Sequence, residues 1–170
     1  MKRKLALLIA IIMVAMVILP ACGKADKDTL AVNVGPDPDT IDPALNSAVD
    51  GAVMIIHAFE GLMILDEDGV PVPGQAESYE VSDDGTVYTF HLRDGLKWSD
   101  GKALTAEDFV YSWNRAVSPD TAADYEYMFD VIDGYDEKNL NVVAKDEKTL
   151  VVTLKNAVPL IISTLFFLSS

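Results

Sequence analysis

The chain has 170 residues, half of them hydrophobic, and a formal net charge of −14 from 27 acidic and 13 basic side chains. So acidic a chain argues against nucleic-acid binding, which needs clustered Lys and Arg to neutralise phosphates. The single cysteine excludes an internal disulfide, and the two histidines have no partner at metal-ligand spacing, so a zinc site is not expected.

The N-terminus has the pattern of a secretory signal. Three basic residues at positions 2–4 precede an apolar run of 15 residues, Leu5–Leu19. This run is shorter than the roughly 20 residues that a membrane-spanning helix needs. We therefore expect a signal peptide over residues 1–21, with an uncleaved membrane anchor as the alternative.

The only cysteine follows directly. Leu19-Pro20-Ala21-Cys22 resembles a bacterial lipobox, in which the signal is cut before the cysteine and the cysteine carries lipid. Pro20 departs from the usual small or β-branched residue. The resemblance implies cleavage between Ala21 and Cys22, lipidation of Cys22 and a polar tether over residues 22–28. Two or three acyl chains hold a protein on a bilayer, whereas one chain does not.

Four segments are expected next along the chain. Alternating apolar residues predict a strand over 30–34, and a helix is predicted from about Asn46 to a C-cap at Gly61. The apolar residues on or near one face of that helix are Val49, Val53, Ile56 and Leu62. A short strand over 63–65 is closed by an acidic turn, and a proline-stiffened extended segment over 70–73 comes after that turn.

The clearest local signals lie in the stretch 76–119. Tyr88, Phe90 and Leu92 alternate with polar residues, which predicts a strand with one apolar face between glycine-containing turns. A second, short strand at Lys97-Trp98 is expected before the next turn.

A capped helix should close this stretch. Thr105 is placed as the N-cap, and Asp108 three residues later completes a capping-box pattern. The apolar residues that share one helical face are Phe109, Trp113, Ala116 and Val117. Ser118-Pro119 ends the helix.

The remaining chain alternates short elements. A short helix is expected within 120–133, then strands over 142–144 and 150–154, then an apolar helix over 158–168 that is too short to span a membrane.

No catalytic or metal motif emerges. The sequence has no G-x-S-x-G, P-loop or GxGxxG pattern. The acidic turns at 66–69 and 83–85 place glycine too early for an EF-hand and are expected to be hairpin turns without bound calcium. We expect no enzyme activity, no metal and no cofactor, with a secreted hydrolase as the alternative.

Several blocks in order resemble the oligopeptide-binding lipoproteins, which are extracytoplasmic solute-binding subunits of peptide ABC importers in the peptide/nickel-binding family. The blocks are Thr40–Pro43, Phe59–Leu62, Ala76–Tyr79, Tyr88–Arg93, Leu96–Gly101, Leu104–Trp113 and Val151–Leu154 with Pro159. The resemblance implies a mixed α/β, periplasmic-binding-protein-like fold of two lobes (type II-like). Members are longer than this chain, so residues 29–170 would be the N-terminal, incomplete part of the solute-binding domain.

The resemblance also implies partners and a site. The expected ligands are short peptides, held largely through their backbone, and the expected protein partners are membrane permease subunits. By position along the family pattern, Ser47, Ala48 and Val49 fall near the cleft, as do Tyr125 and Tyr127, although each has an alternative core or surface role. The expected location is the outer face of the cytoplasmic membrane. A nickel chelate, haem or sugar as ligand, or a peptide-sensing receptor without transport, are the alternatives.

Overall fold

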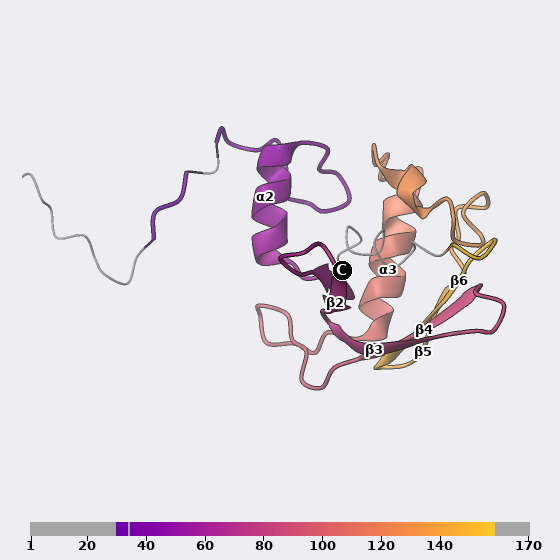
Figure 1. Ribbon diagram of the computed structural model, residues 1–170. Coiled ribbons are helices and arrows are strands. Elements are labelled where there is room, and N and C mark those ends of the chain that lie inside the picture. Colours follow the sequence, from indigo (N-terminus) through magenta and orange to yellow (C-terminus); the bar gives the residue numbers. More distant parts are fainter. Residues whose placement is uncertain (1–29, 34, 159–170) are drawn as a thin grey trace, which may run out of the picture. The chain divides into compact units, whose positions relative to one another are not determined.

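The computed structural model describes residues 30–33 and 35–158 (Figure 1). The expected signal peptide, the tether, Cys22 and nearly all of the apolar stretch 158–168 therefore lie outside the described residues. Residues 30–33 form neither helix nor strand, and the side chains of Leu30 and Val32 are 86% and 66% exposed. The strand predicted over 30–34 is wrong for these residues, because alternation marks a face whereas a strand also needs a hydrogen-bonded neighbour.

Residues 35–158 form two small antiparallel sheets with helices. The elements are α2 (Val49–Ala58), β1 (Met63–Leu65), β2 (Pro71–Pro73), β3 (Ala76–Val81), β4 (Val87–Leu92), α3 (Ala106–Val117), the 3-10 helix η1 (Glu126–Phe129), β5 (Val142–Asp146) and β6 (Thr149–Thr153). Strands β1 and β2 form a hairpin, and the larger sheet has the order β3-β4-β6-β5.

The predicted central strand is confirmed as β4. Tyr88, Phe90 and Leu92 are 6%, 0% and 3% exposed. Its neighbour β3 was not predicted, because all its residues after Ala76 are exposed and the sequence shows no buried face. A strand at the edge of a sheet whose two faces are both exposed needs no alternation of apolar and polar residues.

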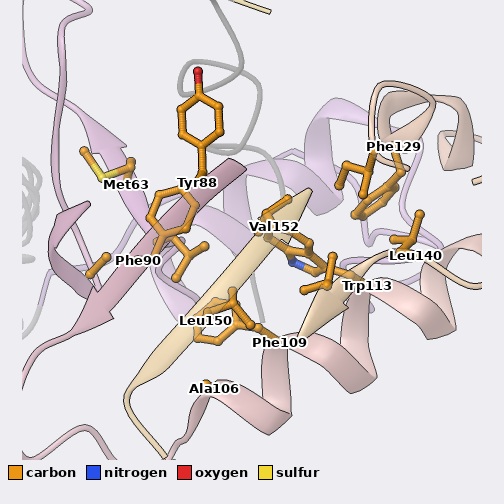
Figure 2. Close-up of a cluster of buried hydrophobic side chains, with 14 of the residues drawn as sticks. Met63, Tyr88, Phe90, Ala106, Phe109, Trp113, Phe129, Leu140, Leu150 and Val152 are labelled. Atoms are coloured by element: carbon orange, nitrogen blue, oxygen red, sulfur yellow. The ribbon is translucent and has the colours of Figure 1, made fainter. Parts of the chain in front are cut away.

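Helix α3 lies where the sequence places it, with Thr105 as N-cap. The Asp108 carboxylate accepts a hydrogen bond from the Thr105 backbone N–H at 2.7 Å, as the capping box requires. The helix packs on β5 and β6, and Figure 2 shows Phe109 and Trp113 pointing toward Leu150 and Val152. This contact forms the main hydrophobic core.

Helix α2 is shorter than predicted. It ends at Ala58, and Phe59 adopts extended geometry (φ −122°, ψ 150°), so Gly61 is not its C-cap. Val49 and Ile56 are 81% and 61% exposed, so the face expected to be apolar and buried is largely open. Leu62 lies beyond the helix and is fully buried at the start of the β1–β2 hairpin.

Other predicted elements are close to the structure. The strands expected after residue 140 are β5 and β6, and the helix expected within 120–133 is a single 3-10 turn. The short strand expected at Lys97-Trp98 is only an isolated bridge between Lys97 and Ala103.

Candidate functional site

A cavity of about 1310 Å³ lies between the segment that carries α2 and the side of the fold that carries α3 and η1. Much of its wall is apolar, with contributions from Ile41, Ile55, Trp98, Leu104, Met128 and Phe129. A hollow of this size with a few polar groups among apolar side chains is the usual form of a binding site for an organic solute.

Two buried polar atoms of the wall residues have no hydrogen-bond partner in the described part of the chain. They are Oε1 of Gln75 and Nε1 of Trp113. The two residues are 8% and 1% exposed and both line the cavity. Leaving such a group unpaired costs about 1–3 kcal/mol. The two atoms themselves have almost no accessible surface, so in this structure they face protein atoms and not the open space of the cavity.

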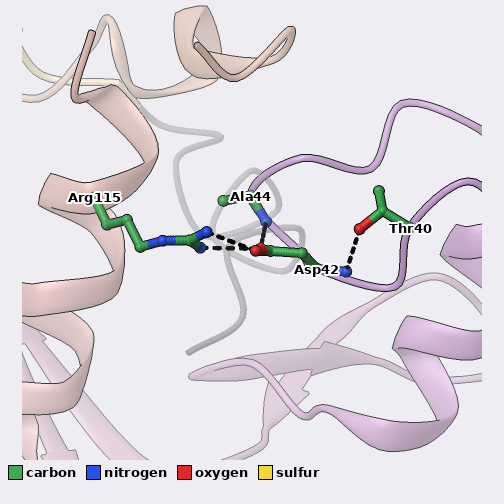
Figure 3. A network of polar contacts seen from close by, with 4 residues as sticks. All are labelled: Thr40, Asp42, Ala44 and Arg115. Carbon is green, nitrogen blue, oxygen red and sulfur yellow. Dashed lines mark hydrogen bonds and ion pairs between the residues drawn. The ribbon is translucent and has the colours of Figure 1, made fainter. Parts of the chain in front are cut away.

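At the edge of the cavity, an ion pair joins α3 to the loop that precedes α2 (Figure 3). Arg115 Nη1 and Nη2 donate to the two carboxylate oxygens of Asp42 at 2.9 and 2.6 Å. The same carboxylate accepts the Ala44 N–H at 3.0 Å. Hydrogen bonds from Arg115 hold the pKa of Asp42 below its ordinary value, against the opposing effect of burial. Asp42 therefore stays ionised and fixes the loop at neutral pH.

Two more carboxylates of the wall are paired. Glu60, just after α2, pairs with Arg93 at the end of β4. Glu126 of η1 pairs with Lys138 at 2.9 Å. The segment that carries α2 is thus held to the rest of the fold by an ion pair at each end, at Asp42 and at Glu60.

The predicted aromatic pair lies at the rim. Tyr125 lines the cavity and is 46% exposed. Tyr127 is 57% exposed and is not part of the wall, but its ring packs edge-on against that of Tyr125, with centroids 5.8 Å apart. The pair presents open aromatic surface beside the cavity.

The second predicted group, Ser47, Ala48 and Val49, is exposed at the N-terminus of α2. These residues do not line the cavity, although the preceding Asn46 does. Val49 is 81% exposed in the part of the chain that the structure describes.

Sequence reasoning missed three features of the wall. Gln75 sits in a polar stretch without a motif, and Lys97 was assigned only to a short strand. Trp113 was correctly expected to be buried, yet the residue also lines the cavity. The unpartnered indole N–H is a signal that only the folded structure gives, because it depends on neighbours from other elements.

The two acidic segments at 66–69 and 83–85 form turns, as the sequence predicts. Asp66 Oδ1 accepts the N–H groups of Asp68 and Val70, and Asp84 Oδ1 accepts the Thr86 N–H. Within residues 30–33 and 35–158, no cluster of three or more His, Cys, Asp or Glu side chains is placed to hold a metal ion. Across the same ranges, no helix combines the length and apolar character needed to cross a bilayer.

Comparison with known proteins gives consistent matches. The family model described as bacterial extracellular solute-binding proteins, family 5 Middle, matches residues 70–170. The periplasmic oligopeptide-binding protein OppA of Escherichia coli (strain K12) is 44% identical over 145 residues, which are 79% of this chain and 26% of that protein.

Solved structures agree with these matches. Haemophilus influenzae OppA in complex with RPPGFSPFR matches with a TM-score of 0.77 and 36% identity, over 81% of this chain and 29% of that one. Listeria monocytogenes OppA bound to peptide matches with a TM-score of 0.73 and 38% identity, over 76% and 28%. The chain thus spans between a quarter and a third of the length of these proteins.

Proposed function

Because the chain belongs to the bacterial extracellular solute-binding proteins of family 5, we propose that it is part of a protein that captures short peptides outside the cell and delivers them to the membrane permease of an ABC importer. The observation that carries this proposal is the similarity of the chain's fold, at 38% identity, to a relative whose structure is bound to peptide.

The cavity has the chemistry that such a ligand needs. A peptide in extended form has unpaired N–H and C=O groups, as a strand has at a sheet edge. The side-chain amide of Asn46 and the hydroxyl of Ser99, both on the wall, can hydrogen-bond with such groups. The apolar wall then contacts side chains without reading their sequence, so we expect broad selectivity.

The rim residues complete this picture. Tyr125 with Tyr127 offers an aromatic surface for a ligand side chain. Ser47, Ala48 and Val49 lie at the start of α2, next in sequence to Asn46 of the wall. The function is binding and release, with no bond made or broken and no cofactor.

The location follows from the N-terminal sequence. We place the protein on the outer face of the cytoplasmic membrane. There it would be anchored by lipid on Cys22, after cleavage of the signal peptide between Ala21 and Cys22. Cys22→Ser should abolish incorporation of labelled palmitate and release the protein from the membrane fraction. Unchanged membrane retention would contradict the lipid anchor but not peptide binding.

The test of binding is a thermal-shift screen of the full chain against a library of di- to pentapeptides. A ligand that binds the folded state at 100 times its Kd stabilises that state by about 2.7 kcal/mol, which raises Tm. No shift with any peptide, together with a shift for a nickel chelate, haem or a sugar, would overturn the peptide assignment.

A further inference from the structure

Lys138 lies outside the cavity but is paired with a residue of its wall. Its Nζ donates to the Glu126 carboxylate at 2.9 Å, and the two side chains are 31% and 34% exposed. Glu126 lines the cavity as the first residue of η1, whereas Lys138 does not line it. Among the described residues, Lys138 is the only ion-pair partner of Glu126. The charge of this wall carboxylate is therefore compensated by a residue outside the wall.

The backbone at Lys138 has a geometry that disfavours any side chain. Its φ is +55°, in the left-handed region where a Cβ lies too close to the following carbonyl oxygen and where glycine is the usual residue. The turn is closed by backbone hydrogen bonds, including one from Lys138 N–H to the Tyr135 carbonyl at 3.0 Å. Such bonds do not need a lysine, so the turn alone does not explain why this position carries a long, charged side chain.

An aromatic ring fixes the direction of this side chain. The Lys138 ammonium group lies 4.2 Å from the centroid of the Tyr135 ring, which is packed against the hydrophobic core. Lys155 lies 5.3 Å from the centroid of the same ring, but its ion-pair partner is Asp136, at 2.5 Å, which does not line the cavity. The two lysines therefore share the ring and the charge, and only Lys138 is linked to the cavity wall.

The Glu126 carboxylate lies where its charge can act on an occupant of the cavity. Its neighbour in the chain, Tyr125, lines the cavity and is 46% exposed. An unpaired carboxylate beside this ring attracts a cationic ligand group and repels an anionic one. A carboxylate paired with Lys138 does so much less, because the opposite charge is 2.9 Å away.

We propose that Lys138 is a positioning residue of the binding site: it holds Glu126 and η1 at the cavity wall and keeps this carboxylate from selecting ligands by their charge. The inference rests on the proposed peptide-binding function and adds to it a reason for broad selectivity. Lys138 acts through Glu126 and does not touch the ligand. Because both side chains are about one-third exposed, solvent screening keeps the effect modest.

The binding test uses the full chain in detergent and two amidated peptides, Ala-Phe-Lys-Ala and Ala-Phe-Glu-Ala. The measured quantity is the ratio of their Kd values, from titration calorimetry of the wild type, Lys138→Met and the matched control Lys155→Met. Lys138→Met should change this ratio about threefold in favour of the lysine peptide, and less at high salt. Lys155→Met should leave the ratio unchanged. Adding Glu126→Gln to Lys138→Met should restore the wild-type ratio, because no carboxylate is then left unpaired.

Two further variants separate this role from a role in the turn. Lys138→Arg keeps the charge and should keep the wild-type ratio. Lys138→Gly suits the left-handed backbone but removes the ion pair, so it should shift the ratio as Lys138→Met does, whereas a purely structural role in the turn predicts the wild-type ratio for the glycine variant. An unchanged ratio in Lys138→Met, or the same shift in Lys155→Met, overturns the inference while peptide binding stands. A shift that persists after Glu126→Gln is added overturns it as well.

A second measurement needs no ligand. The ring signals of ¹³C-labelled tyrosines are recorded by NMR for the wild type, Lys138→Met and Lys155→Met. The Tyr135 signal should move in both variants, because both lysines lie beside that ring. The signals of Tyr125 and Tyr127, which flank Glu126 and pack on each other, should move only in Lys138→Met. Unmoved Tyr125 and Tyr127 signals in Lys138→Met would contradict the positioning of η1. If these signals move as expected but no peptide binds the wild type, the proposed function fails and the positioning of η1 stands.

Discussion

Asp42 and Arg115 lie 73 residues apart in the sequence, yet they form a two-point ion pair that joins the loop before α2 to α3. Helix α2 itself buries only Gly51, so apolar packing holds it weakly. The ion pair is therefore one of the few specific contacts that set the position of this cavity wall.

Arg115→Met tests that role. Methionine keeps much of the apolar stem of arginine but removes the charge and both hydrogen bonds. The two side chains are 36% and 30% exposed, so screening reduces the benefit of the pair, and we expect a loss of about 0.5–1 kcal/mol in unfolding free energy. Urea unfolding at low and high salt measures it.

The control for this variant is Lys102→Met, which removes an ion pair with Asp100 inside one exposed turn. That pair joins no separate elements, so its loss should be smaller. An equal effect of the two substitutions would show that the Asp42 contact has no special part in holding α2.

Acid should release the same contact. The pKa of Asp42 is lowered by hydrogen bonds from Arg115, so its contribution to stability is present above the ordinary pKa of an unfolded Asp, about 4, and is lost as pH falls through the lower folded value. Asp42→Asn should therefore be less stable than the wild type at pH 7, and the difference should shrink below about pH 4. Chemical unfolding at a series of pH values measures this convergence.

Asp39→Asn serves as the control, because Asp39 is exposed in the same loop and the substitution removes the same charge. Its stability difference from the wild type at pH 7 should be smaller than that of Asp42→Asn. A constant difference between Asp42→Asn and the wild type from pH 7 to pH 2 would contradict the linkage.

The capping box of α3 gives a third prediction. The Asp108 carboxylate accepts the Thr105 backbone N–H at 2.7 Å and the Thr105 hydroxyl at 3.1 Å. Asp108→Ala should cost about 1 kcal/mol, because it removes the cap and a negative charge near the positive end of the helix. Glu107→Ala removes a neighbouring exposed acid in the same first turn and should cost less. Similar losses of thermal stability in the two variants would exclude the cap as the cause.

Local signals explain what the sequence could predict. Strand β4 and helix α3 carry their own alternation, turns and cap, and both are confirmed. The expected family and its mixed, periplasmic-binding-protein-like fold are confirmed by the family match and by the solved structures. Lipidation of Cys22 stays a prediction.

The cavity could not be predicted in the same way. Gln75, Lys97 and Trp113 come from three separate parts of the chain, and none belongs to a spacing motif that links it to the others. The Asp42–Arg115 contact likewise depends on the fold that brings the loop to α3. Helix α2 was extended too far because periodicity does not locate the residue at which the backbone turns to extended geometry.

Gln75→Leu tests the cost of an unpaired amide in this wall. Gln75 is 8% exposed and its Oε1 has no partner in the described part of the chain, so replacing the amide by an apolar group of similar size removes a desolvation cost. We expect the variant to gain up to about 1 kcal/mol in unfolding free energy. Gln75→Ala is the control for volume: it also removes the acceptor but leaves a void, so it should lose stability. Urea unfolding of the two variants measures both differences. A destabilised Gln75→Leu variant would show that the amide is satisfied within the fold.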